Sequence, residues 1–183
     1  MKCSVYIAAS LDGFIAKPDG DIEWLDHPDY ILKDKNEDFG FYTFMDSVDA
    51  LVMGRHTFEK VLSFGEWPYE KPVVVLSSKL NSIPGDLEGK VIPMSGSPKE
   101  IVAQCAERGF NHLYIDGGKT IQQFLNAELI DVITITKIPV LLGDGIPLFG
   151  KTEKDIYMEL ISCTQYENGF VMVVYEPIYR GVS

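Results

Sequence analysis

Three short segments of the sequence combine glycine, hydroxyl and basic residues directly after a hydrophobic run. Glycine lets the main chain approach a ligand closely, and the N–H groups at the start of a helix bind phosphate. Basic side chains beside such N–H groups add the charge that an anion needs. These residue types therefore favour binding of a phosphorylated ligand. In chain order the candidates are Gly54, Arg55, His56 and Thr57; then Ser77, Ser78 and Lys79; then Gly117, Gly118, Lys119 and Thr120.

Each of the three segments has a simpler explanation when it is taken alone. The glycines could form tight turns, the serines could be turn residues, and His56 could be a solvated residue at a helix start. All three nevertheless follow expected strands of one sheet, and the carboxyl ends of parallel strands line a single ligand-binding edge. Together they predict one elongated, phosphorylated ligand such as a dinucleotide. We also expect Thr57 to cap the helix that follows it.

The elements that must position these segments follow from the hydrophobic pattern. Short β-branched runs alternate with amphipathic stretches, which is typical of a sheet with helices on both faces. The Asn168-Gly169 pair predicts a hairpin between the last two strands, so the sheet is expected to be mixed, with an antiparallel C-terminal edge. We expect one α/β domain over residues 1–183, with strands at 5–9, 50–53, 73–76, 90–93, 112–115, 132–138, 158–164 and 170–176 and helices at 34–46, 57–63, 98–108 and 120–126.

Residues 10–28 show no clear periodicity and carry Gly13, Pro18, Gly20 and Trp24. A loop of this length in a compact domain is more often a functional lid than a simple connection. We therefore expect a lid over a ligand here.

The net charge of −11 argues against a nucleic-acid-binding protein and against binding to anionic lipid. An anionic ligand must instead find donors gathered locally, as in the three segments above. The apolar N-terminal run is too short for a signal peptide or a membrane span, so we expect a cytoplasmic protein. Cys3, Cys105 and Cys163 form no CxxC pair, which favours buried, unreactive thiols over disulfides or a metal site.

Five segments resemble a known superfamily. Residues 53–59, 71–78 and 115–119 are similar, in the same order, to the three NADPH-binding segments of dihydrofolate reductases. Residues 9–16, with the later Trp24, and residues 138–149 resemble the reductase domain at the C-terminus of the riboflavin-biosynthesis deaminase-reductase. The resemblance implies a dihydrofolate-reductase-like three-layer fold whose mixed sheet is mostly parallel.

The resemblance also implies roles for single residues toward NADPH. Ala9 and Ile15 would border the nicotinamide, beneath a lid formed by residues 10–24. The first segment would bind the pyrophosphate and the 2′-phosphate end, and the third would place a helix N-terminus against the pyrophosphate through a cis peptide bond between Gly117 and Gly118. Leu76, Ser77, Ser78 and Lys79 would surround the adenosine 2′-phosphate, and Arg55 with Lys79 would favour NADPH over NADH.

The substrate side rests on fewer residues. Asp38, beside Glu37, aligns without gaps with the acid that grips the pterin ring in dihydrofolate reductases. A buried carboxylate facing a heterocycle would have a raised pKa. Asp38 could equally be one of several acids on a solvated helix face. Asp12 and Trp24 are further substrate-side candidates, although a turn-forming role before Gly13 suits Asp12 better.

We therefore expect a reductase that transfers a hydride from NADPH to a small nitrogen heterocycle, of the 5-amino-6-(5-phosphoribosylamino)uracil reductase type. The chain departs from the riboflavin reductases after the second strand, where their Asp-Pro and downstream Arg are replaced by other residues. Dihydrofolate reductase activity and a non-catalytic NADPH-binding module are the alternatives. The resemblance also implies a homodimer, and the apolar strand 171–175 calls for cover on both faces.

Overall fold

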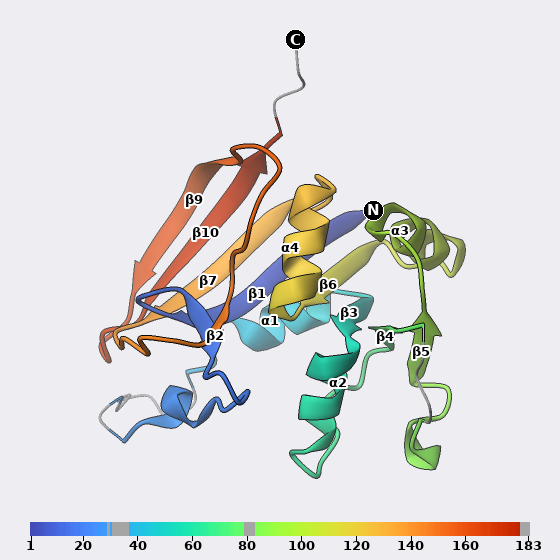
Figure 1. The fold of residues 1–183 in the computed structure, drawn as a ribbon, viewed down its shortest axis with the longest axis horizontal. Coiled ribbons are helices and arrows are strands. Elements are labelled where there is room, and N and C mark those ends of the chain that lie inside the picture. Colours follow the sequence, from blue (N-terminus) through green and yellow to red (C-terminus); the bar gives the residue numbers. More distant parts are fainter. Residues whose placement is uncertain (29, 31–36, 79–82, 180–183) are drawn as a thin grey trace.

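One sheet of eight strands organises the described part of the chain, which in this computed structural model comprises residues 1–28, 30, 37–78 and 83–179 (Figure 1). The strand order is β5-β4-β3-β6-β1-β7-β10-β9. The first six strands in this order run parallel, whereas β10 pairs antiparallel with both β7 and β9. The expected mixed sheet and C-terminal hairpin are therefore confirmed. The strands are β1 (Lys2–Ser10), β3 (Ala50–Gly54), β4 (Val73–Leu76), β5 (Val91–Met94), β6 (His112–Asp116), β7 (Val132–Ile138), β9 (Tyr157–Gln165) and β10 (Val171–Ile178).

Helices cover both faces of the sheet, and this gives the three layers expected from the sequence (Figure 1). Successive side chains of a strand point to opposite faces. Leu113 and Ile115 of β6 accordingly pack with α3 (Pro98–Glu107) and α4 (Gly118–Asn126), whereas Tyr114 packs with α1 (Phe41–Ser47) and α2 (Arg55–Leu62). We call these the α4 face and the α1 face.

The helix boundaries follow local capping chemistry. At α3, the hydroxyl of Ser97 accepts the N–H of Glu100, and the Glu100 carboxylate accepts the N–H of Ser97 at 2.7 Å. This reciprocal capping box explains why α3 begins where the sequence predicted. The other helices begin at different residues than predicted: α2 and α4 start two residues earlier, and α1 starts only at Phe41, although residues 34–36 of the expected helix lie outside the described residues.

Four short elements were not expected from the sequence. Residues 10–28, the expected lid, contain β2 (Phe14–Ala16), which pairs with β8 (Ile146–Pro147), and the 3-10 helix η1 (Glu23–Asp26). A second 3-10 helix, η2 (Gly85–Leu87), precedes β5. Such elements are too short to leave a periodic pattern, but β2 and β8 tie the lid to the loop after β7.

The central strands β1 and β6 separate toward the carboxyl edge of the sheet. Their pairing runs only from Lys2↔His112 to Ser4↔Tyr114, whereas β1 stays paired with β7 as far as Ser10↔Ile138. The hydroxyl of Tyr114 donates to the carbonyl of Tyr6 at 2.7 Å where the strands part. The last residues of β1 and β6 therefore form no ladder with each other.

The C-terminal hairpin corrects one expectation about the cysteines. Cys3 and Cys105 are buried, and burial raises the pKa of the Cys3 thiol to about 12. Cys163 is exposed, because β9 is the outermost strand of the sheet and is exposed along nearly its whole length. The prediction of three buried thiols is wrong for Cys163.

No helix in the described ranges is long and apolar enough to cross a bilayer.

Candidate active site

The β3–α2 and β6–α4 junctions lie against each other at the carboxyl edge of the sheet. A Cβ on Gly54 would lie 3.3 Å from the hydroxyl oxygen of Thr120, and a Cβ on Gly117 would overlap the hydroxyl oxygen of Thr57. Gly117 also has a φ of 86°, which other residues rarely adopt. The two glycines therefore permit the contact, and the starts of α2 and α4 come together there. The first and third candidate segments are thus one structural unit.

Two details of these junctions differ from the expectations. Thr57 does not cap α2, because the helix already begins at Arg55 and has no side-chain cap, so Thr57 lies inside the first turn and faces Gly117. The bond between Gly117 and Gly118 is not cis, since the described residues contain no cis peptide bond. The positive φ of Gly117 makes the turn into α4 instead. The predicted cis bond is therefore wrong.

The second candidate segment lies beside the first. Leu76 pairs in register with Gly54, so Ser77 and Ser78 extend from the sheet next to the start of α2. Ser77 is partly buried, and its N–H donates to the carbonyl of Met94 at 3.0 Å; Ser78 is exposed. Lys79, the remaining candidate of this segment, lies outside the described residues.

The basic side chains at the start of α2 share one acidic neighbour. Arg55 Nε lies 3.5 Å from Glu59 Oε1, and His56 Nδ1 lies 3.6 Å from Glu59 Oε2. The side chains of Arg55, His56 and Glu59 are 41%, 79% and 54% exposed, so these pairs are weak and open to competition. An anion at this helix start would compete with Glu59 for Arg55. Lys119 at the start of α4 is exposed as well.

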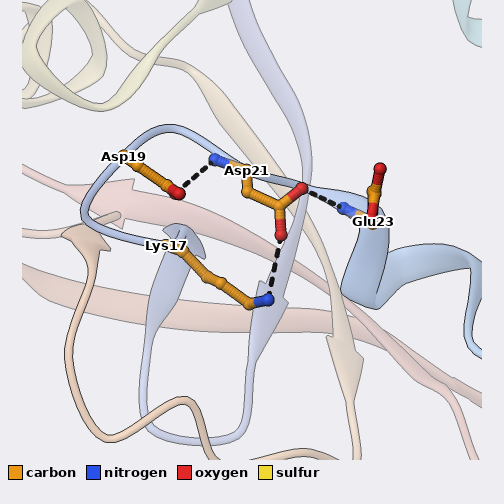
Figure 2. Close-up of polar contacts among 4 residues, drawn as sticks. All are labelled: Lys17, Asp19, Asp21 and Glu23. Carbon is orange, nitrogen blue, oxygen red and sulfur yellow. Dashed lines mark hydrogen bonds and ion pairs between the residues drawn. The ribbon is translucent and has the colours of Figure 1, made fainter.

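The lid contacts the third junction through Ile15. A Cβ on Gly118 would lie 3.2 Å from Ile15 Cδ1 and 2.9 Å from the carbonyl oxygen of Pro147. Beyond β2 the lid is held by its own polar groups, as Figure 2 shows: the Asp21 carboxylate accepts the N–H of Glu23 at 3.0 Å and pairs with the Lys17 ammonium at 2.9 Å. These contacts, the Glu23 N–H first, hold the pKa of Asp21 below its usual range.

Asp12 ties the start of the lid to the loop after β7. Its carboxylate accepts the hydroxyl of Ser10 at 2.6 Å and the N–H groups of Leu142 at 3.2 Å and Gly143 at 2.8 Å. These hydrogen bonds, with Ser10 the largest influence, hold the pKa of Asp12 below its usual range. The carboxylate is thus engaged in holding two loops together, and its substrate-binding role stays a prediction.

Ala9 and Trp24 are both buried, in two different clusters of the core. Ala9 is fully buried near the end of β1, and Trp24 of η1 is 7% exposed and packs with Ile138 and Phe170. The indole Nε1 of Trp24 is buried, and none of the described residues hydrogen-bonds it. Whether these residues border a ligand stays a prediction.

Asp38 lies directly before α1 and bonds to the main chain of that turn. Its carboxylate accepts the N–H of Gly40 at 2.9 Å and the N–H of Tyr42 at 2.8 Å. These two bonds, that from Tyr42 first, lower the pKa of Asp38 below its ordinary value. The expected raised pKa is therefore wrong, because the carboxylate is stabilised in its charged form by backbone donors. No observation tests the catalytic role that the alignment implies for Asp38.

Asp116 is an acid that the sequence gave no reason to single out. It is the last residue of β6, partly buried, and by strand alternation its side chain lies on the α1 face with Tyr114. Its Oδ1 accepts the N–H of Gly117 at 2.7 Å. Burial nevertheless raises its pKa to about 6. A carboxyl group that titrates near neutral pH, at the point where β1 and β6 part, is a candidate proton donor.

The comparisons with known proteins agree with this architecture. A protein from Shewanella sp. PV-4 that is assigned provisionally to riboflavin biosynthesis has a crystal structure with a TM-score of 0.90 to this chain, at 43% identity, covering 98% of this chain and all of that one. The Thermotoga maritima diaminohydroxyphosphoribosylaminopyrimidine deaminase/5-amino-6-(5-phosphoribosylamino)uracil reductase gives a TM-score of 0.73 at 18% identity, over 97% of this chain and 56% of that chain.

A dihydrofolate reductase from Enterococcus faecalis, solved with NADP(H), gives a TM-score of 0.65 at 19% identity, over 96% of each chain. At the identities of the Thermotoga and Enterococcus proteins, the likeness concerns the fold. The model of the RibD C-terminal domain family matches residues 2–172. The superfamily resemblance seen in the sequence is thereby confirmed, and the chain belongs to the RibD C-terminal domain family.

Proposed function

We propose that this protein is a cytoplasmic, NADPH-dependent reductase of a small nitrogen heterocycle, of the type that reduces the phosphoribosylaminopyrimidine of riboflavin synthesis. The observation that carries the proposal is the convergence at one sheet edge of two helix N-termini, held together by Gly54 and Gly117, with the raised-pKa carboxyl of Asp116 beside them. Helix N-termini that can bind phosphate, together with a group that can donate a proton, suit an enzyme that transfers a hydride better than a protein that only binds the cofactor. Family membership supports the same reaction class.

The residues at this edge fit a dinucleotide phosphate. Glycine at 54 and 117 lets the starts of α2 and α4 approach each other closely, so the N–H groups of both first turns lie at one edge, which suits a pyrophosphate. Arg55, with Ser77 and Ser78 directly after the neighbouring strand β4, would hold the adenosine 2′-phosphate. Ala9 and Ile15 would border the nicotinamide. When bound, NADPH would supply the hydride.

The protein's own groups would supply the proton and exclude water. Reduction of a C=N bond adds a hydride to carbon and leaves a nitrogen that must take a proton. Asp116, with a pKa of about 6, holds a proton in part of the population at neutral pH and can hand it to that nitrogen. We assign this role to Asp116 and a positioning role to Asp38, whose bonds fix the start of α1.

The test is NADPH oxidation by the purified protein with the phosphoribosylaminopyrimidine and with dihydrofolate, side by side, together with NADPH binding measured by calorimetry. Oxidation that depends on the pyrimidine supports the proposal, and oxidation with dihydrofolate alone moves the substrate to the pterins. If NADPH fails to bind, the proposal is wrong. If NADPH binds but neither compound is reduced, a non-catalytic binding module is the better description.

We further propose that the protein is a homodimer paired through β9. Tyr157, Leu160 and Ile161 of this outermost strand are 56%, 55% and 50% exposed. An unpaired edge strand with exposed apolar side chains favours association. Sedimentation should give twice the 20.5 kDa chain mass, and Leu160→Lys should give the monomer, whereas Glu107→Lys on α3 should leave the dimer intact. A wild-type mass of 20.5 kDa at micromolar concentration would rule the dimer out.

A further inference from the structure

Helix α4 carries two adjacent glutamines whose surroundings differ. Gln123 is exposed to solvent. The side-chain amide of Gln122 instead donates to the carbonyl oxygens of Pro147 at 3.1 Å and Leu148 at 3.2 Å. A Cβ on Gly150 would lie 2.5 Å from Gln122 Oε1, so the glycine leaves room for this side chain. Gln122 therefore connects α4 to the loop after β7.

The connection is made at β8, which pairs with β2 of the expected lid, residues 10–28. We call these two strands the β2–β8 ribbon. A two-stranded ribbon of this length is marginally stable in water by itself. Burial anchors Leu148, the residue after β8, but the side chains of Ile146 and Pro147 are exposed. Hydrogen bonds to neighbouring elements therefore help to decide where the ribbon lies.

The β2–β8 ribbon lies on the first residue of α4. A Cβ on Gly118 would lie 2.9 Å from the carbonyl oxygen of Pro147 and 3.2 Å from Ile15 Cδ1. Gln122 follows Gly118 by four residues, so both lie on the same face of the helix. The Pro147 carbonyl that passes over Gly118 is the one that accepts from Gln122. The amide thereby helps to fix the distance between Ile15 and the N-terminus of α4.

The loop after β7 is joined to the expected lid at two further points. The N–H of Leu148 donates to the carbonyl of Gly13 at 3.0 Å. The carboxylate of Asp12 accepts the N–H of Gly143 at 2.8 Å. The loop and the start of the expected lid thus form one hydrogen-bonded unit, and a shift of this unit away from α4 would carry β2 with it.

We propose that Gln122 is a positioning residue, which holds the β2–β8 ribbon on the start of α4 and thereby keeps Ile15 beside bound NADPH. The proposal rests on the proposed function for the identity of the cofactor. Without the amide, two loop carbonyls lose their donor, the ribbon leaves the helix start more often, and NADPH is released faster. Because the amide acts through the ribbon, the rate of NADPH association should hardly change.

Two matched variants test this, Gln122→Met and the exposed control Gln123→Met, which keep the length of the side chain and remove the amide. Hydrogen exchange is measured without cofactor over residues 10–16 and 142–149, and NADPH association and dissociation are measured by stopped flow. In Gln122→Met, exchange in both segments and NADPH dissociation should be about 5–10-fold faster, the usual scale for a lost hydrogen bond. Exchange in β6 and α3 should stay as in the wild type, and Gln123→Met should match the wild type throughout.

Each outcome has a separate meaning. Faster exchange confined to residues 10–16 and 142–149, with faster release of NADPH and unchanged association, supports the proposal. Unchanged exchange in these segments overturns it, as does unchanged NADPH release or faster exchange that extends to β6 and α3. Failure of the wild type to bind NADPH overturns the proposed function and the cofactor part of this proposal, whereas exchange without cofactor still shows whether Gln122 holds the ribbon.

Discussion

Two carboxyl groups, those of Asp38 and Asp116, lie on the α1 side of the molecule. Their surroundings shift their pKa values in opposite directions. Asp38 precedes α1 and accepts two main-chain N–H groups, which stabilise its charged form and lower its pKa. Asp116 ends a central strand, accepts a single N–H from Gly117, and has its pKa raised by burial to about 6. Backbone hydrogen bonds stabilise the charged form of Asp38, whereas burial disfavours the charged form of Asp116.

This difference suggests that Asp38 has a structural role and that Asp116 can transfer a proton. A carboxylate with well-formed backbone bonds stays ionised at neutral pH and has no proton to give. A partly desolvated carboxyl whose pKa lies near the working pH can both give and regain a proton. Position in an alignment favours Asp38, but electrostatic surroundings favour Asp116. The predictions below separate the two residues.

The largest expected difference is in turnover. Asp116→Asn should lower kcat roughly 100-fold or more, the usual scale for a lost proton donor, because the amide cannot supply the proton. Asp38→Asn should change kcat only a few-fold. Both variants should bind NADPH nearly as the wild type does. A large loss in Asp38→Asn with a mild effect in Asp116→Asn would reverse the assignment.

NADPH binding should depend on Arg55 and should not depend on either carboxylate. Arg55→Ala should weaken NADPH binding by roughly 1.5–3 kcal/mol, the range for hydrogen bonds to charged groups, and barely affect NADH. His56→Ala, a neighbour that shares Glu59, serves as the comparison. Equal losses for NADPH and NADH in a binding titration would show that Arg55 does not contact the 2′-phosphate.

The two acids should also differ in the sign of their effect on stability. Ionisation of Asp116 is disfavoured in the folded state, so its effect on stability becomes unfavourable as pH rises from 3.8 through about 6. Asp116→Asn cannot ionise and should stabilise the protein at pH 8 by at most about 3 kcal/mol, an upper bound because the side chain is not fully buried.

Asp38 should behave in the opposite way, because its folded-state pKa is lowered. Its stabilising effect is present above pH 3.8 and is lost as pH falls through the folded-state pKa. Asp38→Asn should lower Tm at pH 8 by about 2–4 °C, since it weakens the start of α1. Thermal melts at pH 8 and pH 4 check both residues, and shifts of the same sign at pH 8 would contradict this distinction.

Much of the fold was predictable because its signals are local. The strands 73–76 and 132–138 match the structure residue for residue, and α3 begins at its predicted capping box. The elements that were missed depend on distant partners. β2 exists because it pairs with β8, about 130 residues later, and α2 starts early because the turn at Gly54 leads directly into the helix.

One feature of the candidate site, the meeting of two junctions, was also predictable. Glycines and hydroxyls at strand ends identified the two junctions that meet through Gly54 and Gly117. The state of the acids was not predictable, since charge stabilisation depends on contacts that the sequence does not display. The N–H groups of its own turn stabilise the charged form of Asp38, whereas burial at the end of β6 disfavours the charged form of Asp116.

The most direct test of Asp116 as the proton donor is the pH dependence of kcat/KM for the heterocycle, measured for the wild type and Asp116→Asn. In the wild type, kcat/KM should be highest at acid pH and fall about tenfold per unit above a pKa near 6, since the protonated carboxyl is the active form. In Asp116→Asn, kcat/KM should be low and independent of pH in this range. If the variant keeps both the wild-type rate and the descending limb, Asp116 is not the proton donor.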